Sequence, residues 1–297
     1  MTMNKAITEY LRYHKLMGHT NKTISNYHDV LTQFVKFTGD IDIEDINIDL
    51  IRDYQESLIN RGLSNTTVAN YLTHIKAFIN YLIEEYDLTA KDLPNRIKMP
   101  RKKKRIVDLF TSEQVRLIFN SISAESEWLR LRNCLLVALM YDSGLRQEEL
   151  TKINLQDINR DNNLLLVHGK GNKERFVPLG ATTLKYLDLY LDCRPFDLSF
   201  LFCNRRGDRI TTNAVKQFMQ DLRNKTGLKN LSSHKLRHNF ATNYCINQYK
   251  KTGNVDIYKL VELMGHEDVE TTRIYLHLAQ QFIASSGFIS MLDNITA

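Results

Sequence analysis

The spacing of apolar side chains predicts helices over the first third of the chain. Apolar residues recur three and four positions apart in four segments, which places them on one face of a helix. These segments are residues 7–17, 24–35, 50–58 and 68–82. Ser64 or Asn65 is positioned to cap the last of them. Residues 1–97 are therefore expected to form a four-helix domain.

The composition changes abruptly after this domain. Pro94 and Pro100 disfavour helix, and an unbroken basic run follows. The run consists of Arg101, Lys102, Lys103, Lys104 and Arg105. Because like charges resist collapse into a core, residues 98–108 are expected to form an extended linker. The linker could be a solvated tether, or its side chains could replace counterions on DNA phosphates.

The pattern from residue 109 onward predicts a larger α+β domain, which runs to residue 297 and ends in a C-terminal tail. The helical segments are residues 112–122, 128–141, 147–153, 182–191, 211–225, 234–248, 256–264 and 269–280. Two short β-type runs, 164–168 and 175–179, enclose Gly169-Lys170-Gly171, a composition typical of a hairpin turn. The expected fold class is mainly α with a small β-hairpin or sheet.

Composition narrows the class of protein only modestly. A chain of 297 residues with 43% hydrophobic and 25% charged residues can build two cores. The net charge of +6 favours a polyanionic partner, although many basic proteins bind no nucleic acid. The four cysteines are too scattered for a metal site and are expected to be reduced thiols. With no apolar run long enough for a membrane span and no secretion signal, a cytoplasmic location is expected.

Two cationic side chains follow glycine turns. Arg146 comes after Gly144, and Glu149 lies three residues further on, where its carboxylate can orient the guanidinium toward a phosphate. An Arg-x-x-Glu pair is also a common surface ion pair. Lys170 at the hairpin tip could protonate a leaving alkoxide, or it could be part of an ordinary solvated turn.

A helix near residue 234 carries two further candidates. His234 and Arg237 share one face, opposite an apolar stripe, so both are expected to face a site. His234 and His238 also have the four-residue spacing of zinc ligands on a helix. No carboxylate ligand is evident nearby and cationic neighbours repel a metal ion, so neither a metal nor a cofactor is expected.

Tyr275 allows two interpretations. A tyrosine at helical spacing usually belongs to the core. A phenol with a pKa of about 10 is a poor nucleophile unless cations and a proton acceptor lie close to it. Arg146, Arg237 and His234 would supply both, and His266 lies upstream of Tyr275 in the same part of the chain. Tyr275 is therefore a candidate nucleophile.

Together these motifs resemble the tyrosine recombinase, or phage integrase, family, and its Xer-like two-domain members in particular. They occur in that family's order and span the chain from about residue 111 to residue 280. The motifs are Tyr141-x-Ser143-Gly144-Leu145-Arg146-x-x-Glu149-Leu150, Gly169-Lys170-Gly171-Asn172-Lys173-Glu174-Arg175, His234-x-Leu236-Arg237-His238, and Gly265-His266 followed by Thr271-Thr272-x-x-Tyr275. Two departures are Ser143, where threonine is commoner, and a longer segment at residues 247–255. The first hundred residues are similar to the family's core-binding domain, though less specifically.

The resemblance implies a site and a reaction. The implied site residues are Arg146, Lys170, His234, Arg237 and His266 around the scissile phosphate, with Tyr275 as nucleophile and Glu149 as a supporting residue. A 3′-phosphotyrosyl link would form without metal or ATP, in a homotetramer on double-stranded DNA that passes through a Holliday junction. The reaction would integrate, excise or resolve a mobile element or replicon dimer. The apolar tail at residues 282–292 could dock on a neighbouring protomer or pack on its own domain.

Three other functions fit parts of the same pattern. A type IB-like topoisomerase would use a similar site without a specific sequence. A catalytically inactive DNA-binding regulator would keep the fold and lose the reaction. A zinc hydrolase would depend on a bound metal, which a chelator would remove.

Overall fold

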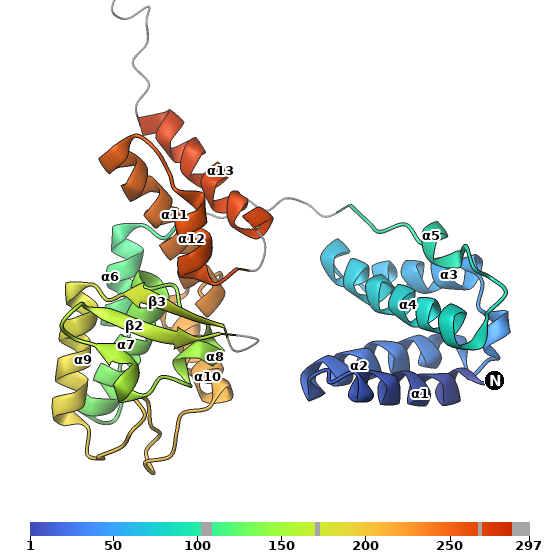
Figure 1. The fold of residues 1–297 in the computed structure, drawn as a ribbon, viewed down its shortest axis with the longest axis horizontal. Coiled ribbons are helices and arrows are strands. Elements are labelled where there is room, and N and C mark those ends of the chain that lie inside the picture. Colours follow the sequence, from blue (N-terminus) through green and yellow to red (C-terminus); the bar gives the residue numbers. More distant parts are fainter. Residues whose placement is uncertain (102–108, 170–172, 267–268, 287–297) are drawn as a thin grey trace, which may run out of the picture. The chain divides into compact units, whose positions relative to one another are not determined.

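A computed structural model describes residues 1–101, 109–169, 173–266 and 269–286, and its elements are shown in Figure 1. The chain divides into two compact units between residues 106 and 107. The described residues are mainly helical with one small sheet, which confirms the predicted fold class. Among these residues, every helix is too short or too polar to cross a membrane.

Within residues 1–101, four longer helices build the first unit around an aromatic core. Its elements are α1 (Met3–Leu16), α2 (Asn21–Thr38), the 3-10 turn η1 (Ile43–Asp45), α3 (Ile48–Asn60), α4 (Asn65–Tyr86) and the short α5 (Leu93–Arg96). Helices α1, α2 and α3 each contact α4. Tyr10, Phe34 and Phe78 are fully buried, and Tyr10 meets Phe78 edge-to-face at 5.3 Å between ring centroids. Such rings contribute much of the apolar area that stabilises a small domain.

Local signals set the helix ends in this unit. The Ser64 hydroxyl accepts a hydrogen bond from the backbone N–H of Thr67, so Ser64 rather than Asn65 caps α4. The expectation that Leu16 and Met17 continue the apolar face of the first helix is wrong. They are 78% and 58% exposed, because α1 ends there and the chain turns away from the core.

The second unit consists of helices around a three-stranded antiparallel sheet (Figure 1). Its described elements are α6 (Ser112–Asn120), α7 (Glu127–Asp142), α8 (Gln147–Leu150), the 3-10 turn η2 (Leu155–Asp157), β1 (Ile158–Asn159), β2 (Leu164–His168), β3 (Glu174–Pro178), α9 (Ala181–Cys193), α10 (Thr212–Thr226), α11 (Ser233–Thr252), α12 (Ile257–Met264) and α13 (Val269–Ser286). The predicted hairpin is confirmed, with Leu164 opposite Pro178 and His168 opposite Glu174. Strand β1 pairs with the other edge of β2.

Helix α7 forms the centre of this unit. Its residues from 133 to 140 are all buried, and it packs against both α9 and α11. A helical segment that is covered on every side is apolar all round, as residues 134–140 are. The turn that follows α7 is therefore anchored in the core, and it carries Arg146.

Gly144 shapes this turn. Its φ of 66° lies in the left-handed region, and an added Cβ would come within 2.4 Å of Cδ1 of Phe240 in α11. We expect Gly144→Ala to lower the free energy of unfolding by about 2–5 kcal/mol, from backbone strain and overpacking together. Urea unfolding measures this loss.

Gly253 provides a matched control for that substitution. Its φ is 71°, but no atom lies within 4 Å of the Cβ position. Gly253→Ala should therefore cost about 1–2 kcal/mol, from backbone strain alone. Equal losses in the two variants would show that the Phe240 contact does not constrain the turn.

Candidate active site

A buried carboxylate organises the cationic residues of the second unit. The Glu149 side chain, in α8, is only 4% exposed. Its oxygens accept hydrogen bonds from Arg175 Nη1 and Nη2 at 2.9 and 2.8 Å and from Arg146 Nη1 at 2.8 Å. Arg237 Nη1 lies 3.9 Å from Glu149 Oε2. Three guanidinium groups thus surround one carboxylate, and the cluster has a net positive charge.

The same carboxylate fixes the start of α8. Glu149 Oε2 accepts the backbone N–H of Arg146 at 2.7 Å, in the manner of a capping box. Burial by itself would raise the pKa of Glu149, but hydrogen bonds and charges from Arg175 and Arg146 outweigh burial and lower it to about 2. Glu149 is therefore ionised at neutral pH and holds the arginines in place.

Main-chain carbonyl groups position the two arginines that the motifs single out. Arg237 is buried and donates to the carbonyl oxygens of Gly144 and Met264. Arg146 Nη2 donates to the carbonyl of Gly265 at 3.0 Å, and its side chain is 35% exposed. Burial, and then the charge of Arg146, lower the pKa of Arg237, but a guanidinium is basic enough to stay charged. Arg146 is the more accessible of the two.

Arg175 belongs to this cluster, although the motif that ends with it did not mark it as a site residue. It lies in β3, where burial alternates and Arg175 shares the inward face with Val177. Its Nε donates to the carbonyl of Leu263 at 2.8 Å, which joins β3 to the end of α12. The available signal was this alternation, because a charged residue at an inward position requires a partner.

His234 and His266 lie in the field of the same arginines. His234 is exposed in the first turn of α11, and partial burial followed by the charges of Arg237 and Arg146 lowers its pKa. Burial and then the same two charges lower the pKa of His266 to about 4. Nδ1 of His266 lies 2.8 Å from Oγ1 of Thr272. If the hydroxyl donates, the neutral imidazole carries its proton on Nε2 and can donate to a ligand.

Acid should destabilise the protein partly through His266. Its folded pKa of about 4 is below the value of about 6.5 expected in the unfolded chain, so the unfolded state binds the proton first. The stability that His266 contributes at neutral pH is therefore lost as pH falls below about 6.5, and the loss levels off near pH 4. Between these two values the unfolded state binds about one proton more than the folded state. We expect a contribution on the order of 1–3 kcal/mol in urea unfolding at graded pH. His266→Gln should make the profile shallower in this window, and an unaltered profile would assign the loss to other groups.

Tyr275 combines both interpretations of its sequence position. It is 3% exposed within an apolar cluster of α11, α12 and α13. Its ring centroid lies 5.3 Å from that of His238 and 6.3 Å from that of His266. Burial raises its pKa, while Arg237 and Arg146 act in the opposite direction. The phenol is thus a core residue that borders the cationic cluster.

Several predicted residues fall outside the described part of the chain. These are Lys170 and the linker residues Lys102, Lys103, Lys104 and Arg105. The side chains of the tail from Phe282 onward lie outside it as well. Arg101 is described and is exposed. In the part that is described, no group of three or more His, Cys, Asp or Glu is arranged to hold a metal ion.

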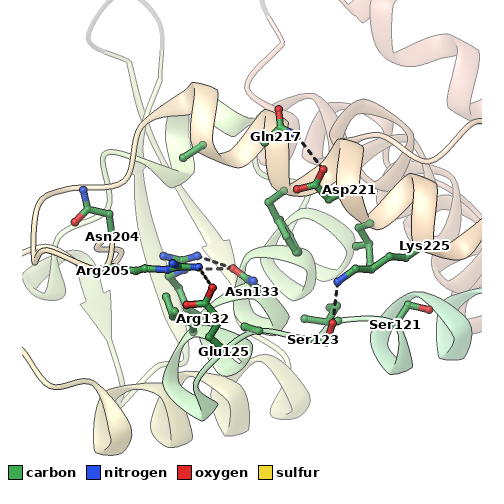
Figure 2. A pocket seen from close by; sticks show the side chains of 16 residues that line it. Ser121, Ser123, Glu125, Arg132, Asn133, Asn204, Arg205, Gln217, Asp221 and Lys225 are labelled. Atoms are coloured by element: carbon green, nitrogen blue, oxygen red, sulfur yellow. Dashed lines mark hydrogen bonds and ion pairs between the residues drawn. The ribbon is translucent and has the colours of Figure 1, made fainter.

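Figure 2 shows a separate pocket between α10, the start of α7 and two loops. Its volume is about 670 Å³. None of the described catalytic candidates is among the residues that line it. Arg205 pairs with Glu125 at 2.8 Å, and Lys225 Nζ donates to Ser123 Oγ at 2.8 Å. Carboxylates offset part of the positive charge here, so the pocket is a weaker site for phosphate chemistry than the cluster at Glu149.

Comparison with known proteins identifies the family of this chain. Residues 108–281 match the phage integrase family, and residues 2–99 match the phage integrase SAM-like domain. The first match covers more than half of the chain. The chain belongs to the phage integrase family. It is a tyrosine recombinase of the Xer-like type and acts in site-specific DNA recombination.

Similar proteins cover almost the whole recombinase. Tyrosine recombinase XerC of Lactobacillus delbrueckii subsp. bulgaricus is 30% identical over 300 residues, covering 95% of this chain and 96% of that protein. The Tn1549 transposon integrase, solved with circular intermediate DNA, has a TM-score of 0.76 at 16% identity and covers 93% and 95% of the two chains. A lambda integrase tetramer bound to a Holliday junction has a TM-score of 0.74 at 18% identity, covering 93% and 77%. These two structures share the fold.

Proposed function

We propose that this recombinase cuts duplex DNA with Tyr275, whose hydroxyl attacks the scissile phosphorus. A 3′-phosphotyrosyl link forms and a 5′-hydroxyl leaves. The observation that carries the proposal is the position of Tyr275, whose ring centroid lies 6.3 Å from that of His266. The carbonyls of the two residues before His266, Met264 and Gly265, hold Arg237 and Arg146. A phosphodiester under attack needs such cations on its non-bridging oxygens.

Arg146 and Arg237 form the phosphate clamp in this scheme. A guanidinium has five N–H donors, and the bonds described above use two on each arginine. Glu149 and Arg175 fix the pair before DNA arrives, so the charges need little reorganisation during the reaction. This preorganisation favours the transition state, in which charge on the phosphoryl oxygens is greatest.

Two other residues transfer protons, and a third, His266, donates a hydrogen bond. His234 accepts the phenolic proton, since its lowered pKa leaves it neutral at pH 7. His266 donates a hydrogen bond from Nε2 to a phosphate oxygen. Lys170 acts as general acid for the leaving 5′ oxygen, an assignment that rests on its sequence position between two glycines. The scheme needs neither metal nor ATP, because the arginines neutralise charge and the phosphotyrosyl bond conserves the energy of the phosphodiester.

The assembly that we propose is a homotetramer that exchanges strands through a Holliday junction. The lambda integrase tetramer on a Holliday junction, which shares the fold, supports this inference. Residues 1–97 would serve as the DNA-binding domain and residues 98–108 as the linker. The biological reaction would be integration, excision or resolution of a mobile element or replicon dimer.

A suicide substrate tests the function. A nicked duplex from the DNA that flanks the gene loses a short fragment after cleavage, so the covalent protein–DNA complex accumulates. We expect this complex in EDTA and without ATP. Relaxation of plasmids that lack the site would instead indicate a type IB-like topoisomerase, and site binding without any covalent complex would indicate an inactive regulator.

The linker makes a further prediction. Asn65 Nδ2 donates to the carbonyl of Arg101 at 2.9 Å, which anchors the start of the basic run to α4. If Lys102, Lys103 and Lys104 contact phosphates, the triple Gln variant should bind every DNA sequence more weakly. The slope of log K against log salt should fall in magnitude by about 0.9 per lost contact. An identical slope would make the linker a tether.

A further inference from the structure

His238 lies against Tyr275 and has a ring nitrogen that the described structure does not use. Within the described residues, Nδ1 of His238 is buried and has no hydrogen-bond partner. The two ring planes are inclined by 47° at a centroid distance of 5.3 Å. His238 is in α11 and Tyr275 is in α13, and these helices pack together. A buried polar atom without a partner costs free energy, so it points to a partner in another state of the site.

The groups around His238 favour the neutral imidazole. On α11 it faces His234, Lys235 and Arg237, and from the other elements it faces Tyr275 and His266. Burial, and then the charges on α11, lower the pKa of His238. A neutral imidazole has one acceptor nitrogen, and with the proton on Nε2 that acceptor is Nδ1. Nδ1 of His238 can therefore accept a hydrogen bond from a hydroxyl group beside it.

We propose that His238 is a positioning residue for the nucleophile: its Nδ1 accepts the hydroxyl hydrogen of Tyr275 as the tyrosine leaves the apolar cluster and approaches the phosphate. This inference rests on the proposed role of Tyr275. His238 keeps its protonation state throughout. In the chemical step the hydroxyl hydrogen leaves its hydrogen bond to His238 and passes as a proton to His234. The tyrosine oxygen bonds to phosphorus, the bond to the 5′ oxygen breaks, and Lys170 supplies a proton to the leaving oxygen.

Two substitutions separate this role from simple packing. His238→Phe keeps an aromatic ring but has no acceptor, whereas His238→Asn places an amide oxygen near the position of Nδ1. On the suicide substrate we expect the single-turnover rate of covalent complex formation to fall about 10- to 100-fold in His238→Phe, because the hydroxyl loses the hydrogen bond that positions it for attack. His238→Asn should recover most of that rate. DNA affinity should stay within about twofold in both, because both variants keep the two arginines of the phosphate clamp.

The outcomes are distinct. A wild-type rate in His238→Phe, or an Asn variant as slow as the Phe variant, would overturn the proposal while the wild-type covalent complex upholds the recombinase mechanism. If wild-type protein forms no complex through Tyr275, the proposed function fails first. Should His238→Phe not fold, His238→Gln replaces it, because its longer side chain places the amide near Nε2 instead. The Gln variant should then be slow and the Asn variant fast.

Discussion

Tyr275→Phe should form no covalent complex with DNA, a loss of roughly 10⁴-fold or more, because no other group can replace an obligatory nucleophile at full rate. The variant should bind its site with wild-type affinity. The ring of Tyr275 packs among α11, α12 and α13, and phenylalanine retains that packing. Its free energy of unfolding should therefore change by less than about 1 kcal/mol. Gel analysis of a labelled suicide substrate measures the first effect, and a binding titration measures the second.

The control for this variant is its folded state. Urea unfolding that matches the wild type shows that a missing complex reflects lost chemistry rather than lost structure. Complex that persists in Tyr275→Phe would transfer the nucleophile to another residue. Weakened DNA binding with intact cleavage would show that the phenol serves the interface and not the reaction.

Glu149→Gln should be the most destabilising of the site substitutions. The change removes a buried negative charge that Arg146 and Arg175 contact directly, and it leaves their charges poorly compensated. Breaking such a buried pair costs about 3–5 kcal/mol. Cleavage should fall as well, because Glu149 also orients the backbone and guanidinium of Arg146. Urea unfolding at pH 7 and the single-turnover rate report the two effects separately.

Glu148→Gln is the matched control. It makes the same chemical change one residue earlier in α8, at an exposed side chain. We expect its unfolding free energy to stay within about 0.5 kcal/mol of wild type. If the two variants were equally stable, Glu149 would not be the organising carboxylate, and the arginines would depend on the carbonyl groups alone.

The sequence predicts the long elements well because their signals are strong and local. Apolar residues at helical spacing predict α2 and α4, and the glycines around Lys170 predict the hairpin. The short elements are not predicted by these signals. Strand β1 has two residues, too few to show alternation. Helix α5 contains Pro94, which is tolerated in the first turn of a helix, where its missing N–H is not needed.

The two departures from the family pattern also have structural explanations. Ser143 replaces the commoner threonine and still donates its hydroxyl hydrogen to the carbonyl of Pro178 at 2.9 Å. Most of the longer segment at residues 247–255 forms the last turns of α11, which ends at Thr252 and is capped by Gly253. Neither departure disturbs the arginine cluster.

The site residues also fall into those that the sequence predicts and those that only the structure reveals. Motifs predict the residues that lie close in sequence, such as Arg146 with Glu149, and the structure brings these two together with Arg237 from α11. Motifs do not predict that two residues 26 positions apart, such as Arg175 and Glu149, form an ion pair. Nor do they show that Tyr275 lies in the core, because that burial depends on how α11 and α13 pack.

The most direct test of the account is to identify the amino acid that carries the DNA. The covalent complex from the suicide substrate is digested with nuclease and trypsin, and the peptide that retains nucleotide is sequenced by mass spectrometry. We predict a 3′-phosphonucleotide on the hydroxyl of Tyr275. Nucleotide attached to any other residue, or to the 5′ end of the cut strand, would contradict the mechanism.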